Sequence, residues 1–114
     1  MALEREWMRG AAPLAVLTLL DRCEMYGYDL IEALERDSGG LLAMGQSTVY
    51  PLLYNLEARG LVTPVWRVAP SGRRRKYYRT TAKGRKWLEH HRSQWLTLVR
   101  AMTQLGVPGK EAAT

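Results

Sequence analysis

The stretch 46–57 constrains the fold of this chain more than any other, because its residues define both faces of one helix. Four apolar residues recur at the i, i+3, i+4 and i+7 positions that form a single stripe on an α-helix: Val49, Leu52, Leu53 and Leu56. The opposite face has no formal charge and carries mainly hydroxyl and phenol groups: Ser47, Tyr50, Pro51 and Tyr54. An outer face that serves only solubility usually carries Lys, Glu and Arg. We therefore expect a helix over about residues 47–59 whose outer face meets a surface that forms hydrogen bonds.

A basic hairpin is predicted directly after this helix. Gly60 can end the helix and let Leu61 fold back onto it. The β-branched, partly alternating residues 61–68 predict a strand, and Pro64 places that strand at the edge of its sheet. After a short turn the chain returns as a second strand, so the hairpin covers about residues 61–80. This combination is typical of a winged helix-turn-helix, in which the helix is the recognition helix and the hairpin is the wing.

The residues before the recognition helix predict three more helices. Their expected bounds are residues 2–9, 14–22 and 28–37. Gly10 and Pro13 should separate the first helix from the second, which is apolar nearly all round and therefore central. A turn over residues 24–27 should lead into the third. These elements predict a mainly α fold with a small β-hairpin wing, a winged helix-turn-helix domain over residues 1–81.

A long C-terminal helix is predicted over residues 82–106, with Thr81 as its N-cap and a flexible tail over residues 107–114. Large side chains recur along it at the 3, 4, 3, 4, 3 spacing of a coiled-coil seam: Leu88, His91, Trp95, Leu98, Met102 and Leu105. Trp7 is expected to pack on a partner subunit in the same region. The winged domain is complete without the C-terminal helix, so we expect this helix to pair two copies of the chain. Packing of the helix on its own domain is the alternative.

The positive charge of the chain is concentrated in its second half. The formal net charge is +6 and the isoelectric point is about 9.8, values that suit a polyanionic partner without identifying it. Between Arg67 and Arg92 there are ten Lys and Arg residues and a single acid, Glu89. A solvated basic surface is the alternative explanation. The clustering around the wing favours contact with a polyanion.

Several functional classes lack the residues that they need. Cys23 is the only cysteine, so an internal disulfide is impossible, which favours a reducing cytosol. No run approaches the ~20 apolar residues of a membrane span, and the start lacks the pattern of a secretion signal. We expect a cytoplasmic protein. We find no nucleophile–base pair and no phosphate loop, and His90 and His91 lie on different helix faces, so we expect neither an enzyme nor a metal or cofactor site.

Three ordered motifs resemble those of the PadR family of bacterial transcriptional regulators. The motifs are Tyr26–Tyr28 with Leu30 and Ile31; Ser47–Pro51 with Leu53, Leu56, Glu57, Gly60 and Leu61; and Gly72–Arg79 with Thr81 and Gly84. The resemblance covers roughly residues 10–105. It implies a homodimeric winged-helix repressor that binds DNA, with the C-terminal helix forming the dimer. The chain departs from the family pattern at Ser47, where many relatives have Gly, at Arg74, where some have Pro, and at His91 within the seam.

The winged-helix interpretation identifies candidate DNA-binding residues. Two copies would place their recognition helices in successive major grooves of a pseudo-palindromic operator. Candidates for base edges and phosphates are Gln46, Ser47, Thr48, Tyr50, Tyr54 and Asn55. Candidates for backbone or minor-groove contacts from the wing are Arg73, Arg74, Arg75 and Lys76. Tyr26 and Tyr28 could also touch the backbone, with core packing as the alternative.

A small aromatic ligand is a further expected partner, in addition to double-stranded DNA and a second copy. Trp95 stands where a multidrug-binding branch of the family places a tryptophan at the dimer centre, and Trp7 and Met102 could line the same site. Ordinary dimer packing also explains a tryptophan there. The alternative function is a winged-helix module that binds an acidic protein partner, and RNA binding comes third because no RNA-stacking sheet motif is present.

Overall fold

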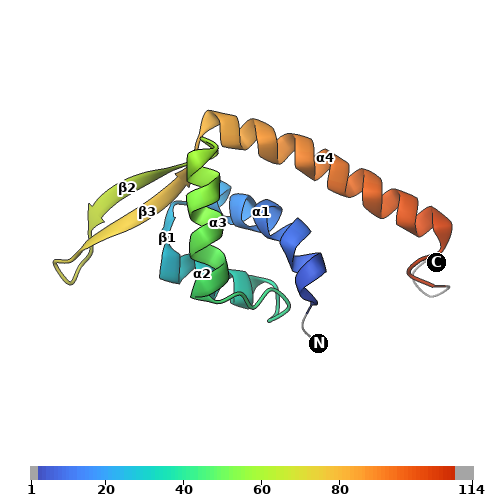
Figure 1. The fold of residues 1–114 in the computed structure, drawn as a ribbon, viewed down its shortest axis with the longest axis horizontal. Coiled ribbons are helices and arrows are strands. Elements are labelled where there is room, and N and C mark those ends of the chain that lie inside the picture. Colours follow the sequence, from blue (N-terminus) through green and yellow to red (C-terminus); the bar gives the residue numbers. More distant parts are fainter. Residues whose placement is uncertain (1–2, 110–114) are drawn as a thin grey trace.

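The computed structural model describes residues 3–109, which form four helices and a three-stranded antiparallel sheet. In chain order the elements are α1 (Arg5–Arg22), β1 (Met25–Tyr26), α2 (Gly27–Asp37), α3 (Gln46–Ala58), β2 (Val62–Val68), β3 (Arg74–Thr80) and α4 (Ala82–Leu105). The β2–β3 hairpin and the outer part of α4 extend from the helical centre in opposite directions (Figure 1), and the molecule measures 55 × 30 × 22 Å. The predicted winged helix-turn-helix with a long C-terminal helix is confirmed.

The apolar stripe of α3 is the part of the core that orients the recognition helix. Val49, Leu53 and Leu56 are fully buried and Leu52 is half-buried against them. Leu17 of α1 and Leu30 of α2 belong to the same cluster. Burial of one such side chain stabilises the fold by about 1.5–3 kcal/mol, so turning α3 about its axis would cost several of these contributions. The outer face of α3 is therefore fixed toward solvent.

The break predicted at Gly10 and Pro13 is wrong, since α1 runs through both residues without interruption. A proline inside a helix removes one backbone hydrogen bond and costs about 3 kcal/mol. Here the helix is held on both sides of the proline. Before the proline, Ala12 lies in the core and Met8 packs against the core; after it, Val16 is fully buried in the same core. Tertiary packing therefore outweighs the local signal; residue 2, the predicted start of the first helix, lies outside the described residues.

The turn predicted over residues 24–27 contains a short strand. Met25 and Tyr26 form β1, which pairs antiparallel with Tyr78 and Tyr77 of β3, so the sheet order is β1-β3-β2. A two-residue strand has no periodicity of its own. It forms because β3 has an unpaired edge on the side away from β2. This partner strand lies about 50 residues later in the sequence.

The junction between α3 and the wing follows the prediction closely. Gly60 adopts a φ of 74°, and its N–H donates to the Glu57 carbonyl at 2.9 Å. The N–H of Leu61 donates to the Leu56 carbonyl at 2.9 Å, which completes a Schellman motif, and Leu61 is buried. β2 lies at the edge of the sheet, as Pro64 predicts.

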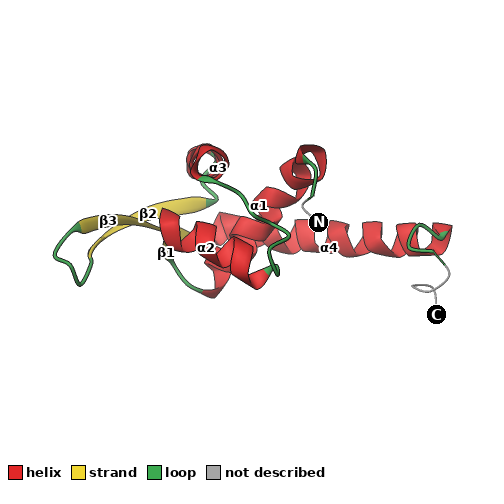
Figure 2. Ribbon diagram, turned by 90° about the horizontal axis from the view of Figure 1, so that it is seen from below, coloured by secondary structure: helices red, strands yellow, loops and turns green. Residues whose placement is uncertain are grey.

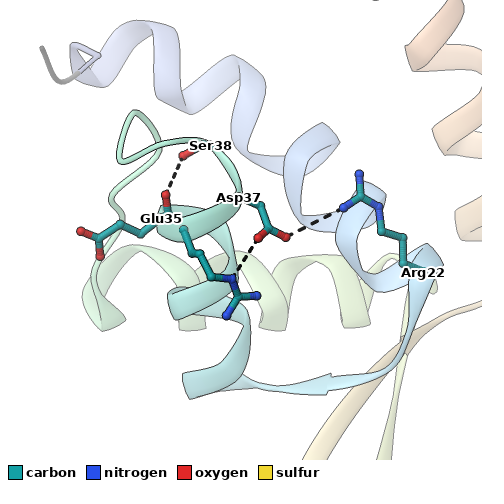
Figure 3. A network of polar contacts seen from close by, with 5 residues as sticks. Arg22, Glu35, Asp37 and Ser38 are labelled. Carbon is teal, nitrogen blue, oxygen red and sulfur yellow. Dashed lines mark hydrogen bonds and ion pairs between the residues drawn. The ribbon is translucent and has the colours of Figure 1, made fainter.

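A polar network joins the ends of α1 and α2 (Figure 3). The carboxylate of Asp37 pairs with its neighbour Arg36 at 3.0 Å and with Arg22 of α1 at 3.9 Å. The hydroxyl of Ser38 accepts a hydrogen bond from the N–H of Leu42 at 2.8 Å. The charged side chains are exposed, so each ion pair contributes about 0–1 kcal/mol. The network mainly fixes the path of the loop that leads into α3.

The start of α4 is anchored on the wing. Thr81 caps the helix as predicted, with its hydroxyl accepting from the N–H of Gly84 at 2.9 Å. A Cβ on Gly84 would overlap the carbonyl oxygen of Leu61, so glycine lets α4 lie close to the backbone just before β2. Gly106, in the left-handed conformation, ends the helix. Of the predicted tail, residues 110–114 lie outside the described residues.

Candidate nucleic-acid interface

A groove of about 380 Å³ lies between α3, the start of α2 and the wing. It is lined by Gly27, by tyrosine rings and by the cations of the wing: Tyr26, Tyr28, Tyr50, Tyr54, Tyr78, Arg73, Arg74, Arg75 and Lys76. All but Tyr78 and Gly27 were predicted site residues, and the structure brings them together from three separate segments. Phenol and guanidinium groups donate hydrogen bonds, and the cations attract negative charge. The groove therefore suits a polyanion rich in acceptor atoms.

Tyr50 is fixed by its contact with the backbone of α2. A Cβ built on Gly27 would come within 2.5 Å of Tyr50 Cζ, so the ring occupies the space that a larger residue would need. Burial raises the pKa of the Tyr50 hydroxyl, and the neighbouring Tyr28 and Tyr54 raise it further. The hydroxyl therefore remains protonated at neutral pH and can donate a hydrogen bond.

The outer face of α3 stays open to solvent. Its exposed residues are Gln46, Ser47, Thr48, Pro51, Tyr54 and Asn55. The side chain of Tyr54 is 55% exposed, although its ring centroid lies 6.4 Å from that of Tyr50. Gln46 Nε2 donates to Tyr28 Oη at 3.3 Å, which connects the start of α3 to α2. These amide and hydroxyl groups are of the kind that pair with base edges.

Ser47 and Thr48 line a second recess, of about 430 Å³, together with Arg5 and Arg9 of α1. α3 and the N-terminal part of α1 lie on the same side of the molecule (Figure 2, in which α3 is seen nearly end-on). Arg5 and Arg9 were not among the residues predicted at the site. Their i, i+4 spacing on a helix is the signal that could have shown that they share a face.

Two arginines of the wing stack on aromatic rings. The guanidinium carbon of Arg75 lies 4.6 Å from the ring centroid of Tyr26, and that of Arg74 lies 5.3 Å from the centroid of Trp66. Stacking orients the plane of a guanidinium and leaves its N–H edges free to donate. Arg73 is exposed beside them. Trp66 was missed, although an exposed tryptophan on a strand opposite several arginines could have indicated this role.

Lys76 lies differently from the three arginines. Its ammonium group is 3.2 Å from Glu57 Oε1 in the last turns of α3, and it lies over the rings of Tyr54 and Tyr78. Its neighbours therefore belong to the recognition helix and to the base of the wing. By its position in the chain Lys76 is grouped with the adjacent arginines as a candidate DNA contact, and nothing in the sequence indicates a role for Glu57 beyond the family motif.

The predicted seam divides into two parts. Four of its residues are exposed on the outer half of α4: Trp95, Leu98, Met102 and Leu105. Trp7 of α1 is also exposed, at 70%. The structure corrects the placement of Leu88, which is buried in the core of its own chain because the first turns of α4 pack on α1. His91 is half-buried and stacks on Trp87, with ring centroids 3.6 Å apart.

None of the helices within residues 3–109 is long and apolar enough to cross a membrane, α4 with its 24 residues included.

Comparisons with known proteins agree with this architecture. The model of the transcriptional regulator PadR-like family matches residues 16–90. The chain is 35% identical over 96 residues to a transcriptional regulator of Mycobacterium tuberculosis, covering 84% of this chain and 86% of that protein. It is 30% identical over 91 residues to the transcriptional regulator YqjI of Escherichia coli; the match covers 80% of this chain and 42% of that longer protein. A crystal structure of a PadR family transcriptional regulator from Eggerthella lenta has a TM-score of 0.76 and 37% identity, covering 88% of this chain and 85% of that chain.

We predict that Gly27→Ala destabilises the fold by about 1–2 kcal/mol, because the added methyl group overlaps the Tyr50 ring and must displace it. In a Tyr50→Ala background the same change should cost little. Thermal unfolding of the two single variants and the double variant, followed by circular dichroism, measures this coupling.

Gly10→Ala is the matched control, because a Cβ at this helical position meets nothing within 4 Å. It should leave stability unchanged or raise it by up to about 1 kcal/mol. If Gly27→Ala lowers the free energy of unfolding equally with and without the Tyr50 ring, the contact with Gly27 does not hold Tyr50 in place.

Proposed function

The chain belongs to the PadR-like family of transcriptional regulators, and from this membership and the lining of the groove we propose that it binds double-stranded DNA in a sequence-specific manner. The observation that carries the proposal is the meeting of a tyrosine-rich recognition helix and an arginine-rich wing at one groove. The protein acts by binding alone, without a catalytic step or a cofactor. As a regulator of genomic DNA it works in the cytoplasm.

Each copy uses α3 and the wing for different parts of the duplex. α3 enters the major groove, where the exposed amide and hydroxyl groups of its outer face read base edges. The hairpin lies beside it and places Arg73, Arg74 and Arg75 along the sugar–phosphate backbone or in the minor groove. The aromatic rings under Arg74 and Arg75 support this role, since they hold the two guanidinium groups in place before DNA arrives.

Two copies bind together as a homodimer. The support is the outer half of α4, where Trp95, Leu98 and Met102 are exposed on one face although soluble monomers seldom expose a continuous apolar stripe. A two-fold dimer would present two recognition helices to a pseudo-palindromic operator, with half-sites about 34 Å apart, one turn of the duplex. Occupation of the operator would repress the adjacent gene.

We predict that Arg74→Ala weakens binding to operator and scrambled duplexes alike and lowers the slope of log affinity against log salt by about one, since one phosphate contact is lost. Tyr54→Ala should weaken operator binding by about tenfold and scrambled binding much less, because Tyr54 lies on the outer face of α3. Tyr54 is a cleaner choice than Tyr50, whose ring also packs on Gly27. Fluorescence anisotropy at several salt concentrations measures both effects; equal losses on both duplexes for both variants would exclude this division of labour.

We predict that Leu98→Glu converts the dimer to a folded monomer, because it places a charge in the apolar stripe of α4 but leaves the core of each chain intact. Size-exclusion chromatography with light scattering reports the mass. Ser93→Glu adds the same charge on the opposite face of α4 and should remain dimeric. A dimer that persists in Leu98→Glu, or a loss of the dimer in both variants, would contradict pairing through this stripe.

We further propose that a flat aromatic compound binds at the dimer seam and releases DNA. The exposed indole of Trp95, with Met102 two turns further on, supports this proposal. A ligand releases DNA in this way only if it binds the dimer more tightly at one spacing of the two recognition helices than at another. Titration of a varied aromatic panel should quench tryptophan emission in the wild type and much less in Trp95→Phe. The proposal is excluded if no compound quenches a dimer that binds DNA.

A further inference from the structure

The recognition helix and the wing are joined by one ion pair within the described part of the chain. Lys76 Nζ of β3 lies 3.2 Å from Glu57 Oε1, which is in the second-to-last position of α3. The other ion pairs within residues 3–109 connect α1 with α2, neighbours within α2, and β2 with the loop before β1. The Lys76–Glu57 pair is therefore the charged link between the two elements that must meet DNA together.

The surroundings of this pair shield it from solvent. The side chains of Lys76 and Glu57 are 29% and 35% exposed. The ammonium group also lies over the rings of Tyr54 and Tyr78, with Nζ 5.5 and 5.2 Å from their centroids. The ammonium is thus enclosed by one carboxylate and two phenol rings, and it faces α3.

The pair compensates a carboxylate oxygen that has no other partner. Glu57 Oε1 is out of contact with solvent and receives no hydrogen bond of good geometry from the described residues, so the Lys76 charge is what balances it. Burial acts to lower the pKa of Lys76, but interactions with Tyr78 and Glu57 outweigh it and the pKa is raised. The lysine therefore stays charged at neutral pH. Removing it would leave an uncompensated, partly buried carboxylate.

We propose that Lys76 is a positioning residue: with Glu57 it fixes the angle between the wing and the recognition helix, and it is not a phosphate contact. This inference rests on the proposed function, DNA binding by α3 and the wing. The pair is neutral as a unit, so it contributes little attraction to the duplex. Its effect is to let the outer face of α3 and the arginines of the wing reach the same site at the same time, which matters most for the operator.

The test compares four variants by fluorescence anisotropy at several salt concentrations. The probes are the duplex that the wild type enriches from a random pool, which serves as the operator, and a scrambled duplex of the same composition. Lys76→Met removes the charge and keeps an unbranched side chain of similar length, and Glu57→Gln removes the opposite charge. The double variant Glu57→Gln/Lys76→Met removes both, and Lys76→Arg preserves the pair. Arg74→Ala is the control for a direct phosphate contact.

A positioning role predicts a loss of specificity without a loss of salt dependence. Lys76→Met should weaken operator binding about five- to tenfold and scrambled binding by less than twofold, with an unchanged salt slope, whereas Arg74→Ala lowers the slope by about one. Lys76→Arg should retain the operator preference. The double variant should bind the operator better than Lys76→Met does, because it leaves no uncompensated carboxylate. Glu57→Gln should lower the ratio of operator to scrambled affinity.

A direct phosphate contact by Lys76 predicts other results and would overturn the inference. Lys76→Met would then lower the salt slope by about one and weaken both duplexes equally. Glu57→Gln would strengthen binding to both duplexes, because a negative charge near DNA is removed. The effects of the two single changes would add in the double variant.

Hydrogen exchange in the absence of DNA separates failure of the inference from failure of the proposed function. Amides of β2 and β3 should exchange faster in Lys76→Met than in the wild type and in Arg74→Ala, since only the first change frees the wing. Unchanged exchange in Lys76→Met would overturn the inference whatever the DNA results are. If the wild type binds no duplex, the proposed function fails, and the exchange rates still decide whether the pair holds the wing.

Discussion

The burial of one apolar stripe on α3 is the constraint on which the rest of this structure depends. Val49, Leu53 and Leu56 are fully buried, so the helix can lie on α1 and α2 in only one rotation about its axis. That rotation decides which side chains remain outside. The uncharged, hydroxyl-rich face is exposed because the opposite face is the core, and the same helix thus serves both folding and the candidate interface.

Contacts between distant segments then arrange the groove around this helix. Tyr50 packs on the backbone at Gly27, Arg75 stacks on Tyr26, and Lys76 of the wing meets Glu57 of α3. None of these contacts is large in energy by itself. Together they hold donors and cations from α2, α3 and β3 in fixed positions relative to one another, an arrangement that would lower the entropy cost of the proposed DNA binding.

The sequence predicts those features that depend on local periodicity or on a local turn. The α3 stripe, the Schellman turn at Gly60, the Thr81 cap and the edge position of β2 are examples, and each is confirmed. The predictions that were wrong, and the features that were not predicted, depend on partners distant in the chain. β1 forms only on the edge of β3, and α1 continues through Pro13 only because packing on both sides holds it.

The candidate site shows the same limit. The tyrosines and arginines were found because they cluster along the chain near a recognisable motif, and the structure gathers them at one groove. The sequence could not separate Lys76 from its arginine neighbours, because the carboxylate that distinguishes it lies 19 residues earlier, in another element. Leu88 was assigned to the seam by its spacing, but helical spacing does not tell whether a side chain packs on its own chain or on a partner.

The proposed function requires that this chain recognises a DNA sequence as a dimer of winged domains. Selection from a random pool of duplex DNA with the purified protein, followed by affinity measurement of the enriched sequence at two salt concentrations, tests it most directly. A dimer of winged domains should enrich a pseudo-palindrome with half-sites about one helical turn apart, and the affinity for it should fall steeply as salt rises. If the folded, dimeric protein enriches no sequence, sequence-specific DNA binding is excluded, and an acidic protein becomes the expected partner of the wing.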